Sequence, residues 1–281
     1  MANWFCNNEP VEHVSISDRA FQYGDGLFET IAIREHKPRL WEYHVQRLAK
    51  GCARLRISMP DEDDLLQNLH DALRQGRAAT AYCVAKIIVS SGAGLRGYGR
   101  NVAAEPAVFF GVFEATREPP EFYRDGVNIV LCKTHLATKS VTAGLKTLNR
   151  LEQVLARSEL TDSGAFEGLT LDADGNVICG TMSNVFFVAN NKIITPSLDD
   201  CGVEGVMRRH IMTTLSEHEL AVDIGTLHST DLQDVDEVFV ANSQFGVMPV
   251  KSCGDLKWPV GGVTQKVMSI LADNGVVECG L

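Results

Sequence analysis

The sequence predicts an α+β protein with two domains, a smaller N-terminal α/β domain and a larger C-terminal domain rich in strands. The 281 residues, 45% of them hydrophobic, are enough for one large domain or for two smaller ones with separate cores. Helical and strand patterns mix in the first part of the chain, whereas short strands predominate in the second. Segment 114–121 (EATREPPE) combines charges with two prolines, which favours a linker. We therefore predict domains over residues 1–113 and 122–281.

The N-terminal domain is expected to hold two helices among three strands. Alternating apolar and polar residues predict the strands, and apolar residues at helical spacing predict the helices. The strands are expected at Leu27–Arg34, Ala81–Ser91 and Ala107–Phe113, and the helices at Trp41–Arg56 and Glu62–Arg74.

The C-terminal domain is expected to be built mostly from short strands. The sequence DADGN, at 172–176, is a hairpin turn signal. Strands are expected at Val127–Cys132, Gly168–Asp172, Val177–Ile178, Asn184–Val188, Lys192–Thr195 and Glu237–Asn242, and helices at Asn149–Leu160, Val206–Glu217 and Gly262–Asn274. Helical spacing places Leu151, Val154, Leu155 and Ser158 on one face of the first of these helices.

Lys146 stands where a predicted strand or loop gives way to the helix at 149–160. A lysine at such a junction is either a solvated turn residue or a partly desolvated amine. Desolvation lowers the pKa of an amine, which then becomes a nucleophile able to form a Schiff base. From the spacing alone the solvated residue is the more common case, and it is the rest of the chain that favours the nucleophile.

The composition restricts the possible partners. A formal net charge of −10 offers no basic footprint for nucleic acid, so an anionic substrate would need local arginines. The eight cysteines include no CxxC pair, which is typical of reduced thiols in a cytosolic protein. The first residues (MANWFCNNEP) lack the basic and apolar regions of a secretory signal, and no apolar run approaches the length of a membrane span. We expect a cytoplasmic protein without a metal, nucleic-acid or membrane partner.

Six sequence blocks resemble, in the same order, those of the fold-type IV pyridoxal-phosphate enzymes. The blocks are SDRAFQYGDGLFET (17–30), HVQRL (44–48), GLKTLNRLEQ (144–153), GNVICGTMSNVFFV (175–188), GVEGVMRR (202–209) and NSQFGVMPV (242–250). Any one block is weak, and their shared order over nearly the whole chain carries the resemblance. The group includes branched-chain and D-amino acid aminotransferases and 4-amino-4-deoxychorismate lyase. Several blocks are most similar to those of the lyase.

The resemblance implies that pyridoxal phosphate is the cofactor. It makes Lys146 the residue that holds the cofactor as a Schiff base and assigns the cofactor phosphate to Arg47. Arginine suits that role because its guanidinium is a fixed, always charged fork. A solvated arginine is the ordinary alternative on a helix such as the one predicted around Arg47.

Two backbone segments are also expected to hold the phosphate. GVEGVMRR places a glycine-rich turn directly before a helix, where N–H groups can bind an anion without a charged side chain. The resemblance assigns these contacts to Val206 and Met207. It assigns a similar part to Ser243 and Gln244, in the turn that follows the strand ending at Asn242.

Two further residues are expected to act on the substrate. Arg96 lies in the glycine-rich run GAGLRGYGR, which is either an exposed loop or a loop close to a ligand. The resemblance makes Arg96 the ligand of a substrate carboxylate. Thr30 is a good strand former, and the resemblance to the lyase implies that it assists proton transfer near the lysine. Phe28 stands where D-amino acid aminotransferases tend to carry a tyrosine, which also favours the lyase.

Cys179 is a departure from the family pattern. Members of the family usually place a glutamate under the pyridine nitrogen of the cofactor, and the matching residue here is Cys179. A carboxylate keeps that nitrogen protonated and the ring strongly electron-withdrawing, whereas a thiol is a poor substitute. An elimination that yields an aromatic ring has a large driving force of its own. Cys179 therefore favours the lyase over an aminotransferase.

The resemblance implies a homodimeric enzyme of folate synthesis that converts 4-amino-4-deoxychorismate to 4-aminobenzoate and pyruvate. An aminotransferase acting on D-amino acids or branched-chain amino acids is the closest alternative. A binding protein that keeps the fold without the chemistry is a further alternative, against which Lys146 and Arg47 argue.

Overall fold

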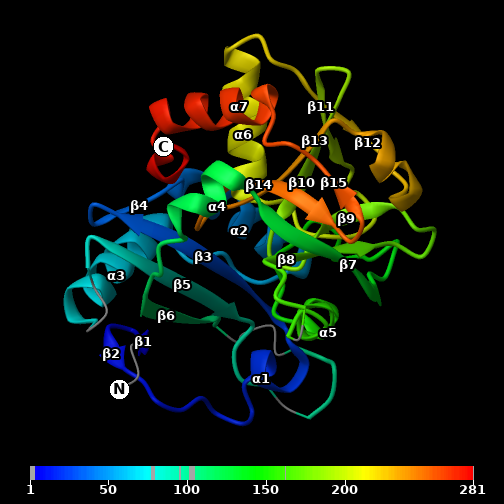
Figure 1. Cartoon of the computed structure of the whole chain (residues 1–281). Coiled ribbons are helices and arrows are strands. Elements are labelled where there is room, and N and C mark those ends of the chain that lie inside the picture. Colours follow the sequence, from blue (N-terminus) through cyan, green and yellow to red (C-terminus); the bar gives the residue numbers. More distant parts are fainter. Residues whose placement is uncertain (1–3, 77–79, 95, 101–104, 162, 281) are drawn as a thin grey trace. The chain divides into compact units, whose positions relative to one another are not determined.

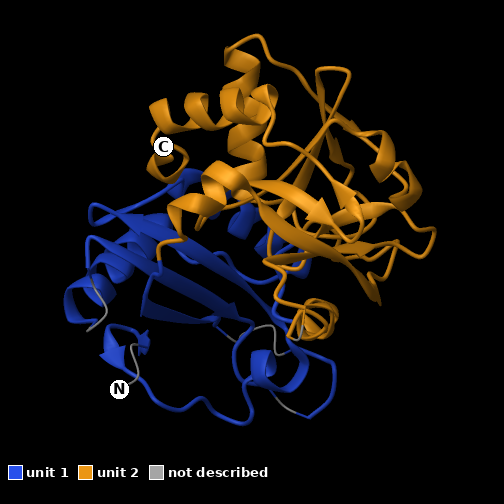
Figure 2. Cartoon of the chain, viewed as in Figure 1, with its two compact units in different colours: residues 1–116, 145–149 blue, residues 117–144, 150–281 orange. Residues whose placement is uncertain are grey.

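Two β-sheets organise the chain, and each belongs to its own unit (Figures 1 and 2). The computed structural model describes residues 4–76, 80–94, 96–100, 105–161 and 163–280. Unit 1 comprises Met1–Thr116 and Leu145–Asn149, and unit 2 comprises Arg117–Gly144 and Arg150–Leu281. The division after Thr116 falls in the segment expected to be a linker. Residues 145–149 group with unit 1, although they lie in the range predicted for the second domain.

Unit 1 contains a six-stranded antiparallel sheet with the order β2-β1-β6-β5-β3-β4. Its strands are β1 Trp4–Cys6, β2 Glu9–Pro10, β3 Gly26–Arg34, β4 Lys37–Pro38, β5 Tyr82–Ser90 and β6 Ala107–Glu114, and its helices are α1 Arg19–Tyr23, α2 Trp41–Leu55 and α3 Glu62–Gln75. Helices α2 and α3 pack on one face of the sheet, where Leu48 and Leu69 join Ile31 and Ile33 in the core. The helices bury this face because their apolar residues recur at helical spacing.

Strand β3 has two different faces. Leu27, Ile31 and Ile33 are buried toward the helices, whereas Phe28 and Thr30 are half-buried on the opposite face. Segment 145–149 runs antiparallel to the beginning of this strand and forms a bridge from Thr147 to Leu27. The lysine segment is therefore an added edge of the unit 1 sheet.

Unit 2 contains a nine-stranded mixed sheet. The order is β12-β11-β10-β13-β14-β7-β8-β9, with β15 paired to β14. The strands are β7 Val127–His135, β8 Glu167–Leu171, β9 Val177–Gly180, β10 Asn184–Ala189, β11 Lys192–Pro196, β12 Val222–Gly225, β13 Glu237–Asn242, β14 Gly246–Cys253 and β15 Leu256–Lys257. The helices are α4 Pro120–Asp125, α5 Leu151–Ser158, α6 Val206–Glu217 and α7 Gly262–Asp273, with short 3-10 turns at Ser229–Asp234 and Val277–Cys279.

The centre of the unit 2 sheet is apolar on both faces. Strands β10 and β13 pair in antiparallel register, and the rings of Phe186 and Phe239 stack with their centroids 4.8 Å apart. Both strands are almost entirely buried because helices and loops cover them. Ile211 of α6 and Leu271 of α7 are likewise fully buried. This rigid centre positions the beginning of β10 and the end of β13, which both matter for the candidate site.

Most of the elements expected from the sequence are confirmed. Gly175, with φ +84°, closes the predicted DADGN turn between the antiparallel strands β8 and β9. Strand β14 was not expected. The helix expected at 149–160 is shorter, and its expected apolar face is open to solvent, with Leu151 76% and Val154 60% exposed. Ala156 is the buried residue of that helix instead.

Candidate active site

Lys146 is half-buried on the added edge of the unit 1 sheet. Its carbonyl accepts a hydrogen bond from the Phe28 N–H at 3.0 Å, which fixes the backbone of the lysine against β3. Its Nζ lies 4.2 Å from the centroid of the Phe28 ring. A lysine held by its backbone, with its amine against an aromatic ring, is not a freely solvated turn residue.

Thr30 shares the sheet face of Lys146. It lies two positions after Phe28 on β3, so both side chains point to the same side of the sheet. Its partner across the sheet is Lys86 of β5, whose Nζ lies 4.8 Å from the same Phe28 ring. The structure therefore brings Lys146, Phe28 and Thr30 together, as the sequence suggests. Sequence reasoning missed Lys86, which the alternation along β5 would have placed on this face.

Arg47, on α2, is held by a buried carboxylate rather than by water. Its Nε donates to Glu29 Oε1 at 2.8 Å, and its Nη2 donates to Glu29 Oε2. The Nδ1 atom of His44 lies 2.6 Å from the same carboxylate. Burial raises the pKa of Glu29, but the neighbouring Arg47 and His44 outweigh it and lower this pKa to about 2. Glu29 thus stays charged and fixes the plane of the guanidinium.

His44 is the third member of this cluster. It is 1% exposed, and burial lowers its pKa below the ordinary value although Glu29 acts in the opposite direction. Among the residues that the structure describes, its Nε2 has no hydrogen-bond partner. Glu29 and His44 are site residues that sequence reasoning missed. The available signals were a carboxylate next to Thr30 on β3 and a histidine three positions before Arg47.

The N-cap residue of helix α6 makes no side-chain hydrogen bond to the beginning of the helix. Its N-cap is Gly205, which has no side chain to occupy the N–H groups of Val206 and Met207, and its first turn carries no acidic residue. A Cβ at Gly205 would overlap Oδ1 of Asn184, so only glycine fits here. Such a helix end suits a phosphate.

Two asparagines lie at the same end of the paired strands β10 and β13, and they hold the expected anion-binding segments. Asn184, at the beginning of β10, donates through Nδ2 to the carbonyl of Val203 at 3.0 Å, two residues before the N-cap of α6. Asn242, at the end of β13, accepts the N–H of Gln244 at 2.8 Å through Oδ1. The backbone donor of Gln244 is thus used inside the turn. The Ser243 hydroxyl accepts from the Gln244 side chain at 3.3 Å.

Cys179, on β9, is a buried neutral thiol. Burial raises its pKa to about 11. The hydroxyl of Thr170 lies 3.5 Å from Sγ and donates to the carbonyl of Cys179 at 2.9 Å. A group in contact with this thiol would therefore face a polarisable neutral sulfur and not an anion.

Arg96 is exposed on the unit 1 loop that follows β5. Arg19 donates to carbonyls of this loop, and Arg100, within the loop, donates to Asp25; sequence reasoning missed both arginines. The structure therefore leaves the Arg96 side chain on the surface of the single chain and fixes the backbone that carries it.

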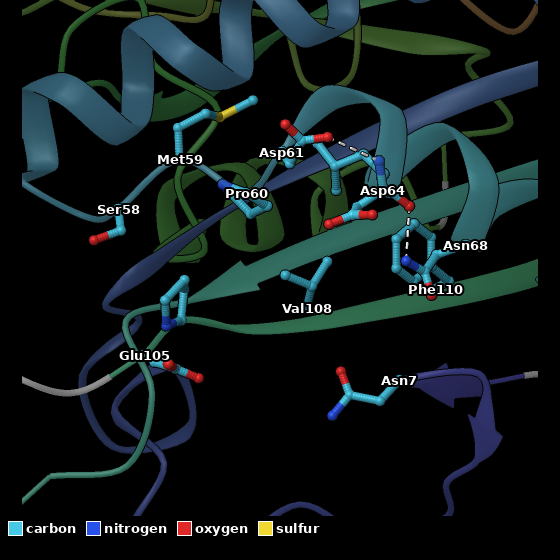
Figure 3. A pocket seen from close by; sticks show the side chains of 12 residues that line it. Asn7, Ser58, Met59, Pro60, Asp61, Asp64, Asn68, Glu105, Val108 and Phe110 are labelled. Carbon is cyan, nitrogen blue, oxygen red and sulfur yellow. Dashed lines mark hydrogen bonds between the residues drawn. The ribbon is translucent and has the colours of Figure 1, made fainter.

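A large hollow of unit 1, of about 680 Å³, lies away from these residues (Figure 3). It is lined by Asn7, Ser58, Met59, Pro60, Asp61, Asp64, Leu65, Asn68, Glu105, Pro106, Val108 and Phe110. Asp61 caps α3 by accepting the N–H of Asp64 at 3.1 Å, and Asn68 donates to the Asp64 carbonyl at 2.7 Å. Within the described part of the chain, no three His, Cys, Asp or Glu residues gather as metal ligands. Asp61 and Asn68 thus serve the helix.

Comparison with known proteins supports the assignment from the motifs. The family model "Amino-transferase class IV" matches residues 26–253. The chain is 34% identical over 272 residues to an aminodeoxychorismate lyase of Vibrio harveyi, covering 95% of this chain and 99% of the relative. It is 26% identical to a D-alanine aminotransferase of Bacillus licheniformis, and the match covers 85% of this chain and 82% of the relative.

A solved structure agrees. The crystal structure of 4-amino-4-deoxychorismate lyase from Pseudomonas aeruginosa matches with a TM-score of 0.90 and 39% identity, covering 97% of this chain and 99% of that one. None of the helices described in the present structure is long and apolar enough to span a membrane. The chain belongs to the class IV aminotransferase family, the fold-type IV enzymes that its motifs resemble.

Proposed function

We propose that this protein is an aminodeoxychorismate lyase, which converts 4-amino-4-deoxychorismate to 4-aminobenzoate and pyruvate in folate synthesis. The observation that carries the proposal is the full-length likeness to lyases, with 34% sequence identity to the Vibrio harveyi relative and 39% sequence identity to the Pseudomonas aeruginosa lyase of known structure. The placement of Lys146 and Thr30 on one sheet face supports it, because the reaction needs a base and a proton donor close together.

The residues present fit pyridoxal phosphate. Lys146 is the primary amine that the cofactor aldehyde requires, and Gly205 keeps the N–H groups of Val206 and Met207 open for its phosphate. Arg47, fixed by Glu29, and the turn at Ser243 and Gln244 are the other proposed phosphate ligands. When bound, the cofactor supplies an aldehyde that reacts with amines and a conjugated ring that accepts electron density.

The protein moves two protons in the proposed reaction. Lys146 removes the proton from the ring carbon of the substrate that bears nitrogen. Its Nζ lies 4.2 Å from the centroid of the Phe28 ring, on the sheet face that also carries Thr30. Lys146 or the Thr30 hydroxyl then gives a proton to the ether oxygen of the departing enolpyruvyl group. Formation of the aromatic ring drives this elimination.

Cys179 is proposed to contact the ring nitrogen of the cofactor, in place of the usual glutamate. With its pKa raised to about 11, the thiol adds no negative charge there. The ring is then a weaker electron acceptor, which an elimination that forms an aromatic product tolerates better than a transamination does. This difference favours the lyase.

An anionic substrate needs a local positive charge on a protein whose net charge is −10. Arg96 is proposed to bind a substrate carboxylate.

The exposed apolar residues Leu151, Val154 and Leu155 on α5 are consistent with a homodimer, as the family resemblance implies. The reduced cysteines favour the cytoplasm.

A D-amino acid aminotransferase is the second candidate, favoured by the likeness to the D-alanine aminotransferase of Bacillus licheniformis. The deciding experiment incubates the protein, loaded with pyridoxal phosphate, with aminodeoxychorismate and measures 4-aminobenzoate. A parallel reaction with D-alanine and 2-oxoglutarate measures exchange of the amino group. Efficient exchange without 4-aminobenzoate would replace the lyase by the aminotransferase.

A further inference from the structure

Arg19, in α1, is a buried arginine whose guanidinium reaches four groups of unit 1. Its Nε donates to Asp25 Oδ2 at 2.9 Å. Its two terminal nitrogens donate to three consecutive carbonyls, those of Gly97 at 3.0 Å, Tyr98 at 3.0 Å and Gly99 at 3.2 Å. Arg19 is only 4% exposed, so these bonds lie away from water, where charge-assisted hydrogen bonds are strong. One side chain thus fixes the course of three successive residues.

The loop that Arg19 holds is the loop that carries Arg96. Its side chains contribute little packing, since Tyr98 is 88% exposed and a Cβ at Gly97 or Gly99 would meet no atom within 4 Å. A segment with so few apolar contacts opens easily unless its backbone is tied down. The three carbonyl bonds to Arg19 supply that restraint.

A second arginine ties the far end of the loop to the same carboxylate. The Nε of Arg100 donates to Asp25 Oδ2 at 2.9 Å, and its Nη2 forms an ion pair with Oδ1. Burial raises the pKa of Asp25, but hydrogen bonds from Arg100 and Arg19 outweigh it and lower this pKa to about 2. Asp25 therefore remains an anion that both arginines share.

The same stretch of chain also holds the lysine segment. Asp25 directly precedes Gly26, whose carbonyl accepts the N–H of Leu148 at 3.0 Å, and Phe28 donates to the Lys146 carbonyl at 3.0 Å. Residues 25–28 therefore anchor both the Arg96 loop and the lysine. Any change in the hold of Arg19 on the loop moves Arg96 with respect to Lys146.

We propose that Arg19 is a positioning residue for recognition of the substrate carboxylate. It acts by holding residues 97–99 on Asp25, which sets the place of Arg96 relative to Lys146. The inference rests on the proposed function, in which Arg96 binds that carboxylate. Because the guanidinium of Arg19 is buried and engaged within the protein, its effect falls on substrate affinity and not on the proton transfers.

Arg19→Lys tests the proposal. A lysine keeps the positive charge beside Asp25 but cannot bond three carbonyls and a carboxylate with one planar fork. The KM for aminodeoxychorismate is expected to rise about tenfold, as when charge-assisted hydrogen bonds are lost, with kcat and the affinity for pyridoxal phosphate within about twofold. Amide hydrogen exchange in residues 96–100 is expected to be faster. Arg124→Lys, an exposed arginine paired with Asp125, is the matched control and should change none of these quantities.

Two further variants keep the result clear. Gly94→Ala places a Cβ 3.0 Å from Cδ of Arg19, so the side chain must shift by a few tenths of an ångström while it remains present; this variant covers the case in which Arg19→Lys does not fold. Arg96→Gln should raise the KM without faster exchange. Unchanged exchange in Arg19→Lys or Gly94→Ala, or a lower kcat at an unchanged KM, would overturn the proposal. A wild-type protein that forms no 4-aminobenzoate would overturn the proposed function alone, because the exchange measurement needs no substrate.

Discussion

In unit 1 the proposed functional groups are charged side chains fixed by buried ion pairs, whereas in unit 2 they are backbone N–H groups and a neutral thiol. Glu29 holds Arg47, and Asp25 holds Arg19, each with a carboxylate whose pKa is lowered to about 2. In unit 2 the open helix end at Gly205 does comparable work without a side chain. The proposed carboxylate binding by Arg96 depends on a charged side chain, whereas phosphate binding at the Gly205 helix end can depend on backbone shape. Each unit should therefore respond to a different kind of perturbation.

Lys146→Ala is the largest perturbation of unit 1. Turnover and the visible absorbance of the bound cofactor are expected to vanish, because alanine has no amine to react with the cofactor aldehyde. Lys192→Ala, an exposed lysine of β11, is the control. Borohydride reduction followed by peptide mapping should label Lys146. A label on Lys86, the other lysine beside the Phe28 ring, would show that Lys86 and not Lys146 forms the Schiff base.

Gly205→Ala is the corresponding perturbation of unit 2. The added Cβ would overlap Asn184 Oδ1 and displace the first turn of α6. The affinity for pyridoxal phosphate, measured by equilibrium titration, is expected to fall about a hundredfold through lost charge-assisted hydrogen bonds. Pyridoxal, which lacks the phosphate, should bind nearly as before. Gly262→Ala in the first turn of α7, where a Cβ meets no atom within 4 Å, is the control. An equal loss of affinity for pyridoxal phosphate and for pyridoxal would show that this helix end does not bind the phosphate.

A fall in pH is a milder perturbation, and it acts on the buried ion pairs of unit 1. The pKa of Glu29 in the folded state is about 2, below its ordinary 4.5, so its contribution to stability is present above 4.5 and is lost as the pH falls toward 2. That contribution is about 3 kcal/mol. Urea unfolding from about pH 5 to 2 should therefore show a flatter pH dependence in Glu29→Gln than in the wild type. Glu42→Gln, an exposed change on α2, should keep the wild-type slope; an unchanged slope in Glu29→Gln would disprove the charged cluster.

Cys179→Glu should have the smallest effect. It replaces the neutral thiol of unit 2 with a charged side chain of the kind that functions in unit 1. A carboxylate beside the ring nitrogen keeps it protonated, so the rate of amino-group exchange with D-alanine is expected to rise about tenfold relative to lyase activity. Cys179→Ser preserves neutrality and should leave the ratio of the two activities unchanged. A ratio that responds equally to serine and glutamate would show that size, not charge, matters at this position.

The strands and helices were largely predictable because their patterns are strong. Strand β13 and helix α6 begin and end where the sequence predicts, since each carries an uninterrupted apolar pattern. Strand β14 was missed because MPV interrupts its pattern with proline, a residue that usually argues against a strand. Helix α5 ends early, and its apolar stripe faces solvent, which periodicity alone cannot reveal.

Residues of the candidate site could be proposed from the sequence where they lie within a motif. Residues whose role depends on a contact with a distant residue could not. Lys146, Thr30 and Arg47 follow from blocks of sequence. Glu29 is adjacent to Thr30 in the sequence, yet its role depends on a helix residue 18 positions away that only the fold brings near. Arg19 likewise bonds groups 78 to 80 positions away. Pairings over such separations are set by tertiary contacts.

The five residues 145–149 have a consequence for synthesis on the ribosome. They complete the hydrogen bonding of β3, yet they are translated after the first 28 residues of unit 2. A nascent chain that stops at Thr116 leaves the N–H of Phe28 and the carbonyl of Gly26 without these partners. This edge of the unit 1 sheet therefore stays open in the shorter chain, and Lys146 joins the sheet only when translation is already well into the following unit.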